Sequence, residues 1–227
     1  MYAASGRGEG RAAITRRELI AAGAVVGAGL AVGARPASGA GERVVRQIDF
    51  SALGDRQGWP AGWACPGVAN LRVSGGVGVL EAGSDVFPYD PRPAAFAVDS
   101  RILEGSVRAV VTEAGSLVGV VIRRTSPRDY YAAFYDVQQG LLSIMRRSGA
   151  DLVTLASIPA PAASGELTLE LSAVNASPTT LSATLTLAGG AVLPTSAVDG
   201  YAALQRAGDA GVLGQARTLF PLSLIHI

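Results

Sequence analysis

Histidine and cysteine, the side chains that most often carry out catalysis or bind metals, each occur once in these 227 residues. His226 is the next-to-last residue, and Cys65 lies in the stretch WACPG. The rest of the chain therefore offers no histidine-based triad, no histidine-ligated metal site and no internal disulfide. We expect Cys65 to be a small buried hydrophobic residue. No P-loop, G-x-S-x-G or dinucleotide-binding glycine motif occurs.

Two tryptophans form the first candidate for ligand contact. Trp59 and Trp63 lie in DFSALGDRQGWPAGW, a stretch rich in glycine and proline. An aromatic ring has a flat apolar face, and such a face on an exposed surface stacks against a sugar ring. The alternative is that both rings are buried and seal one edge of the protein.

The second candidate is the tyrosine-rich segment DYYAAFYD. In an extended strand, Tyr131 and Tyr135 share one face, while Tyr130, Phe134 and Asp136 share the other. One face would then be a tyrosine-lined concave surface that binds carbohydrate, and the other would belong to the core. The alternative is ordinary cross-strand packing with a salt bridge.

Two arginines, Arg123 and Arg124, precede this segment and would point to opposite faces of their strand. Arg123 is the one that we assign to the candidate carbohydrate surface. The segment thus supplies one cation and two phenol groups to the same region, a combination that suits contacts with sugar hydroxyl groups.

Carboxylates form the third candidate. Asp85, Asp90 and Asp99 lie close together in sequence and, with loop carbonyl groups, would suit calcium, although their spacing fits no EF-hand. Paired carboxylates for glycoside hydrolysis are conceivable, but no spacing singles out two of them. Solvated loop carboxylates are the alternative, and no other cofactor is expected.

The elements that would position these residues are strands. Leu167, Leu169 and Leu171 alternate with polar residues in LTLELSA, and LSATLTL repeats the pattern. Short strands of this kind recur every 8–12 residues, with glycine, proline and asparagine between them. The pattern predicts an all-β fold, an antiparallel β-sandwich of the jelly-roll type.

Turn signals divide the strands. DYYAAFYDV and LLSIMRR flank QQG and predict a hairpin, and the strand DLVTLASI follows the turn at Ser148 and Gly149. FPYDPRP, at residues 87–93, predicts a loop because proline cannot pair within a sheet. DGYAALQRAGDAG is the one helix candidate, a turn or two capped by Asp199 and ended by Gly208.

Residues 1–41 have the layout of an export signal. Arg16 and Arg17 precede an uncharged segment, Leu19 to Ala34, and small residues then lead to a cleavage site after Ala40. The paired arginines resemble the twin-arginine type, so we predict a secreted or cell-surface protein. The alternative is an uncleaved membrane anchor, although the apolar segment is shorter than the roughly 20 residues that a span requires.

Composition favours a packed globule: 49% of the residues are hydrophobic and 16% are charged. All 19 basic residues are arginine, and the five in residues 1–41 face only Glu9 and Glu18. Residues 42–220 therefore have a net negative charge and no basic surface for nucleic acid. We expect contact with a membrane only during export.

Residues 43–220 resemble a known family in the order of their features: IDFSALGDRQGW, VGVVIRRTSPRDYYAAFYDVQQGLLSIMRR, LTLELSA and LQRAGDAGVLGQARTLF. This order is similar to the laminin-G and concanavalin-like jelly roll of exported bacterial proteins. More narrowly, it resembles the amino-terminal region of actinobacterial twin-arginine proteins related to alkaline phosphatase D. The resemblance implies a metal-dependent phosphoesterase domain downstream, and no catalytic residue of that domain maps onto this chain.

The predicted organisation has three parts: a signal at residues 1–41, a β-sandwich at residues 42–220 and a non-native tail at residues 221–227. SLIHI resembles a translated sequencing adapter, and a genuine terminal strand is the alternative. We expect the sandwich to be non-catalytic and to hold a glycan, a cell-surface polymer or a downstream catalytic domain. The alternative is a stand-alone glycoside hydrolase or lyase on the same fold.

Overall fold

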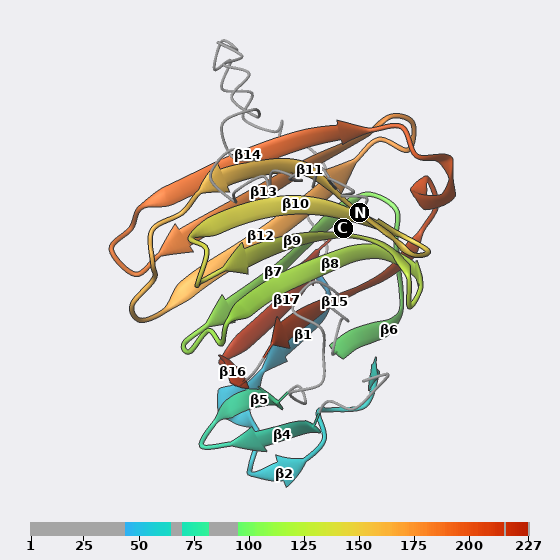
Figure 1. Cartoon of the computed structure of the whole chain (residues 1–227). Coiled ribbons are helices and arrows are strands. Elements are labelled where there is room, and N and C mark those ends of the chain that lie inside the picture. Colours follow the sequence, from blue (N-terminus) through green and yellow to red (C-terminus); the bar gives the residue numbers. More distant parts are fainter. Residues whose placement is uncertain (1–43, 65–69, 82–94, 216, 227) are drawn as a thin grey trace, which may run out of the picture. The chain divides into compact units, whose positions relative to one another are not determined.

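The computed structural model describes residues 44–64, 70–81, 95–215 and 217–226 (Figure 1). All of them belong to one compact unit, Ala40–Ile227. The predicted signal, Cys65 and the predicted loop at 87–93 lie outside the described residues. Within the described ranges, no helix has the length and apolar character that crossing a membrane requires.

The described residues form three antiparallel sheets, two large and one small. The six-stranded sheet has the order β1 (Val44–Asp49), β17 (Leu222–His226), β7 (Gly105–Val111), β12 (Leu167–Val174), β13 (Thr179–Leu187) and β14 (Val192–Asp199). The seven-stranded sheet has the order β11 (Asp151–Pro159), β10 (Leu141–Ser148), β9 (Asp129–Asp136), β8 (Leu117–Ser126), β15 (Gly208–Gln215), β6 (Ala95–Ile102) and β3 (Trp63–Ala64). The small sheet has the order β16 (Arg217–Phe220), β5 (Val77–Glu81), β4 (Asn70–Ser74) and β2 (Arg56–Gln57). Figure 1 shows the two large sheets as the layers of a jelly-roll-like sandwich, which confirms the predicted fold class.

The alternating pattern read from the sequence produces the core between the layers. Leu167, Leu169 and Leu171 of β12 are buried, and so are their neighbours Leu181 and Leu185 of β13. Burying a leucine side chain contributes about 1.5–3 kcal/mol, so each of these leucines adds to the driving force for folding. Their polar partners point away from the other layer, as the period of two requires.

Strand β9 differs from this pattern because both of its faces are buried. Tyr131 and Tyr135 belong to the main core between the layers. Tyr130 and Phe134 belong to a second apolar cluster on the opposite face, together with Leu213 of β15 and other residues. The seven-stranded sheet is therefore apolar on both faces around β9.

The predicted hairpins are present. Gly140 ends the turn between β9 and β10 with φ +64°, and Gly149 lies between β10 and β11 with φ +59°, in the region that favours glycine. The predicted helix of a turn or two is a single 3₁₀ turn, η2 (Ala202–Leu204), and a second such turn is η1 (Phe50–Ala52). Asp199 does not cap η2 but ends β14, and Gly208 begins β15.

The chain's last described residues lie within a sheet. Leu222–His226 forms β17 and pairs with β1 on one side and β7 on the other. Phe220, two residues before β17, is fully buried. The six-stranded sheet thus includes described residues beyond 220, while the predicted boundary at residue 220 and the foreign origin of residues 221–227 stay predictions.

Candidate functional site

The two tryptophans predicted to contact a ligand lie in an aromatic cluster. Trp59 is 6% exposed, and its ring centroid lies 4.8 Å from that of Phe50, 5.5 Å from that of Trp63 and 6.0 Å from that of Phe220. Trp63 is half-buried and packs against the main core. This arrangement is the alternative stated above, in which the rings seal an edge of the protein.

Arg123 is fully buried, although arginine is almost always found at the surface. Its side chain turns inward because β8 is irregular there: the register with β9 shifts between Ile122 and Ser126, and Arg123 has φ +55°. An extra residue in one strand re-aims the next side chain. Arg124 points the other way, 3.9 Å from Asp209, so the two arginines do face in opposite directions.

The Arg123 guanidinium donates hydrogen bonds to two loops, to β13 and to η2. Its Nε donates to Leu103 O at 2.7 Å, its Nη1 to Thr179 Oγ1 at 2.5 Å and to Leu204 O at 3.3 Å, and its Nη2 to Asn175 O at 2.6 Å. Burial lowers the pKa of Arg123, because removal from water disfavours its charge. Arg123 therefore organises the interior and presents no surface to a ligand.

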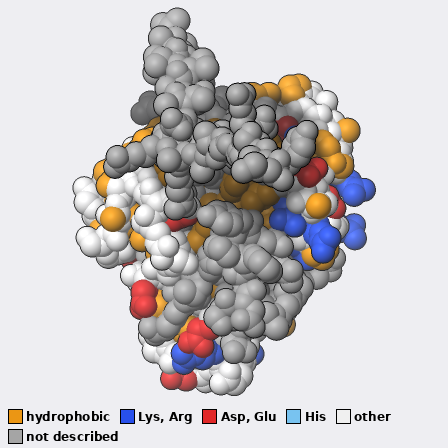
Figure 2. All heavy atoms as spheres, viewed as in Figure 1, with side chains coloured by type: hydrophobic (Ala, Val, Ile, Leu, Met, Phe, Trp, Pro, Cys, Tyr) orange, Lys and Arg blue, Asp and Glu red, His pale blue; other side chains and the backbone are white. Residues whose placement is uncertain are grey.

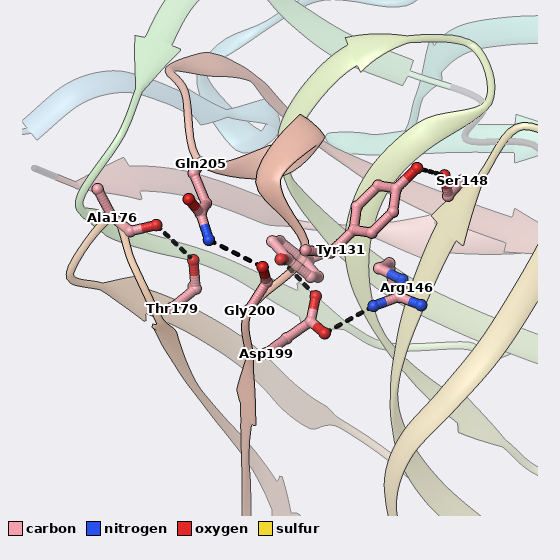
Figure 3. Close-up of polar contacts among 9 residues, drawn as sticks. Tyr131, Arg146, Ser148, Ala176, Thr179, Asp199, Gly200 and Gln205 are labelled. Carbon is pink, nitrogen blue, oxygen red and sulfur yellow. Dashed lines mark hydrogen bonds and ion pairs between the residues drawn. The ribbon is translucent and has the colours of Figure 1, made fainter.

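Tyr131 belongs to a polar chain that crosses between the layers (Figure 3). Its hydroxyl donates to Asp199 Oδ2 at 2.7 Å, and Arg146 Nη1 donates to Asp199 Oδ1 at 2.6 Å. The Arg146 guanidinium lies 4.4 Å from the ring centroid of Tyr201, whose hydroxyl accepts a hydrogen bond from Ser148. These contacts join β9 and β10 of one layer to β14 of the other.

Tyr135 completes the account of the predicted site residues. Its hydroxyl donates to Pro161 O at 2.8 Å and accepts from Ala163 N at 2.8 Å, so it anchors the segment after β11. Tyr131 and Tyr135 are both 0% exposed. The structure thus corrects the expected tyrosine-lined surface: this face of β9 is core, because the second layer covers it. Arg16 and Arg17 of the predicted export signal lie outside the described residues.

The environment of Tyr131 predicts how stability changes with pH. Burial and the hydrogen bond to Asp199 raise the pKa of Tyr131 above 10.0, its ordinary value. Its contribution to stability is therefore fully present below pH 10 and is lost as the pH rises further, because only the unfolded chain then readily releases the proton. We expect Tyr131→Phe to reduce this alkaline slope of the unfolding free energy by up to about 1.4 kcal/mol per pH unit. Denaturant titrations across this pH range measure the slope, and equal slopes would contradict the prediction.

A cleft lies on the other face of the seven-stranded sheet, beside the turn between β9 and β10. It has a volume of about 210 Å³. The register places its walls side by side, since Phe134 pairs with Ser143 and Ser143 pairs with Ser157. The described residues that line it are Leu117, Phe134, Asp136, Gln139, Leu141, Ser143, Met145, Leu152, Thr154 and Ser157.

The cleft combines an apolar surface with polar groups that can exchange hydrogen bonds. Leu117, Leu141, Met145 and Leu152 supply partly exposed apolar surface, whereas Phe134 is 3% exposed and lies beneath it. Ser143 and Ser157 place their hydroxyl oxygens 2.9 Å apart across two strands. The Asp136 carboxylate accepts a hydrogen bond from the backbone of Gln139 at 2.8 Å, which holds the turn in place. Phe134 and Asp136 lie on the face of β9 that the sequence assigned to the core. The hairpin predicted between β9 and β10 was the sequence signal that could have placed these residues beside Ser143, because it aligns the two strands.

The described residues contain no group of three histidine, cysteine, aspartate or glutamate side chains that could hold a metal ion. Asp85 and Asp90 of the expected calcium site lie outside these residues, and Asp99 is described only in its backbone. Calcium binding therefore stays a prediction from the sequence.

Comparison with known proteins establishes the fold. No protein-family model matches the chain. No curated protein matches it either. Among solved structures, the GH43 protein BlXynB of Bacillus licheniformis has a TM-score of 0.54 at 13% identity, and the match covers 79% of this chain and 38% of that chain. GH43B of the Bacteroides ovatus xyloglucan PUL has a TM-score of 0.53 at 14% identity, and the match covers 79% of this chain and 38% of that chain. The bifunctional GH43-CE of Bacteroides eggerthii has a TM-score of 0.54 at 10% identity, and the match covers 80% of this chain and 27% of that chain.

The matched part is thus about two fifths or less of each of those chains. At these identities the similarity defines the architecture, a concanavalin-like β-sandwich, as the sequence resemblance implied. The narrower kinship with laminin-G domains and with alkaline phosphatase D stays a prediction.

Proposed function

We propose that the sandwich binds a carbohydrate in the cleft beside the β9–β10 turn. The observation that carries the proposal is the composition of the cleft: the partly exposed apolar side chains of Leu117, Leu141, Met145 and Leu152 lie next to hydroxyl, amide and carboxylate groups. Ser143, Gln139 and Asp136 supply these polar groups. A sugar ring has an apolar face and a rim of hydroxyl groups, and such a site complements both. The shared architecture with three GH43 proteins, one of them named for xyloglucan, supports the proposal.

The function that we propose is binding without hydrolysis. Glycoside hydrolysis normally needs two carboxyl groups flanking the bond that breaks. Asp136 is the single carboxylate among the described residues that line the cleft. A glycoside hydrolase on this fold remains the rival, and release of reducing sugar by the purified chain, abolished by Asp136→Asn, would favour it.

Two adjacent glutamines provide a matched test of the cleft. Gln139 lines it, whereas Gln138 is also exposed in the same turn but is not among the lining residues. We expect Gln139→Ala to weaken glycan binding about fivefold, since a neutral hydrogen bond contributes about 1 kcal/mol. Isothermal titration calorimetry with the full chain, against oligosaccharides selected on a glycan array, measures the change.

Gln138→Ala is the control and should bind as the unmodified chain does. Equal affinity of both variants would place the binding site elsewhere on the molecule. Absence of binding to any glycan on the array would remove the proposed function and leave a scaffold role.

We further propose that the chain is exported and forms the front, accessory part of a longer phosphoesterase related to alkaline phosphatase D. The support is the order of the sequence features and the paired Arg16 and Arg17, not the described structure. In this arrangement the cleft would tether the downstream enzyme to a cell-surface glycan. The reading frame from an independent genome assembly tests the idea, and a frame without a phosphoesterase after residue 220 would contradict it.

A further inference from the structure

The described residues that line the cleft carry negative charge but no positive charge. Asp136 is the single charged side chain among its described lining residues, and the polar groups beside it, such as Gln139 and Ser157, are neutral. A carboxylate accepts hydrogen bonds and donates none. It therefore suits a ligand that brings hydroxyl donors, and these charge-assisted bonds are stronger than neutral ones.

The basic side chains of this sheet gather at the opposite end of the same strands. Arg147 pairs with Tyr130 at the start of β9, whereas Asp136 ends that strand. Six residues of extended backbone separate Tyr130 from Asp136, about 20 Å. Figure 2 shows basic side chains grouped at the right of the visible face, with acidic side chains among them.

This separation decides how the cleft responds to an acidic ligand. Charges about 20 Å apart at the surface are largely screened, because the Debye length in physiological salt is about 8 Å. The arginine side chains described on this sheet therefore contribute little to neutralising an anionic group bound next to Asp136. Arg147 is further engaged by the backbone of Gly149, to which its Nε donates at 2.9 Å.

We infer that the cleft selects neutral glycans and rejects those that carry a carboxylate or sulfate on the bound sugar. The inference rests on the proposed function and specifies its ligand class. A neutral sugar donates its hydroxyl groups to Asp136. A uronic acid instead brings a second negative charge to the same carboxylate, and the described residues that line the cleft include no cation to offset it. Rejection therefore comes from Asp136 itself, and one substitution at this position should remove it.

The test uses two ligands that differ in a single group. β-1,4-Mannohexaose and β-1,4-hexamannuronate share their linkage and ring stereochemistry, and only the second carries carboxylates. We expect the full chain to bind the neutral hexamer at least tenfold more tightly than the acidic one. Cellohexaose and cellohexaose oxidised to the uronate provide a second pair if mannose stereochemistry is not accepted.

Asp136→Asn should narrow the preference for the neutral hexamer to less than threefold, because asparagine keeps the acceptor for the turn but loses the charge. Asp151→Asn is the matched control, since Asp151 is exposed on β11 and is not among the residues lining the cleft. Melting temperatures confirm that both variants fold.

The outcomes separate the two claims. Equal or tighter binding of the acidic hexamers would overturn the inference while leaving glycan binding intact. A neutral preference that survives in Asp136→Asn would also overturn it. Failure of both members of both pairs to bind, together with a blank glycan array, would remove the proposed function itself.

Discussion

Replacing Arg123 with alanine will lower the free energy of unfolding by about 4 kcal/mol. The buried guanidinium donates to the carbonyl groups of Leu103, Leu204 and Asn175 and to the hydroxyl of Thr179. Alanine leaves the acceptors of Thr179 and Leu204 buried without this donor, and each such loss costs about 1–3 kcal/mol. The part-buried acceptors of Leu103 and Asn175 lose less, because water can reach them. Chemical denaturation monitored by tryptophan fluorescence measures the change.

Arg128→Ala is the control for Arg123→Ala, because Arg128 is exposed in the turn between β8 and β9. It should change stability by less than about 0.5 kcal/mol. Arg123→Lys should fall between the two, since lysine keeps the charge but cannot reach four acceptors in the plane of a guanidinium. A loss below about 1 kcal/mol for Arg123→Ala would show that the hydrogen bonds of Arg123 do not hold the interior together.

Gly208→Ala will also destabilise strongly, by about 3 kcal/mol. A Cβ at Gly208 would lie 2.6 Å from the carbonyl carbon of Arg123 and 2.7 Å from the carbonyl oxygen of Arg124. Both atoms are backbone, so no side chain can rotate away, and the irregular part of β8 would have to move. Thermal unfolding followed by circular dichroism in the far ultraviolet measures the effect.

Gly200→Ala is the matched control, because a Cβ at Gly200 would meet nothing within 4 Å. It should be neutral or slightly stabilising, since alanine restricts the unfolded chain. Similar melting temperatures for Gly208→Ala and the unmodified chain would mean that β15 does not pack this closely against β8.

The sequence was sufficient to predict the strands wherever only one face of a strand is buried. Leu167, Leu169 and Leu171 alternate with polar residues, and the structure buries all three. Gly140 and Gly149 marked two hairpin turns because each has a positive φ that other residues adopt only with strain. Alternation within a strand and a glycine at a turn are local features, so they can be recognised in a single sequence without knowledge of the strand pairing.

The candidate site could not be predicted in the same way. Tyr131 and Phe134 lie on opposite faces of β9 and both are buried, so their types do not reveal which face is the inner one. Arg123 points inward because the register between β8 and β9 shifts at this position. No pattern of residues within β8 predicts that shift. The cleft depends on how three neighbouring strands align, from Phe134 through Ser143 to Ser157.

The polar chain from Tyr131 through Asp199 to Arg146 has a consequence for the mechanics of the sandwich. Apolar side chains tolerate a small sideways displacement of one sheet over the other, because dispersion contacts have little directional preference. Hydrogen bonds are directional and weaken steeply when their geometry changes. Sliding of one sheet over the other would have to break both hydrogen bonds to Asp199 together. We therefore expect the sheets to shift less around Asp199 than where only apolar side chains lie between them.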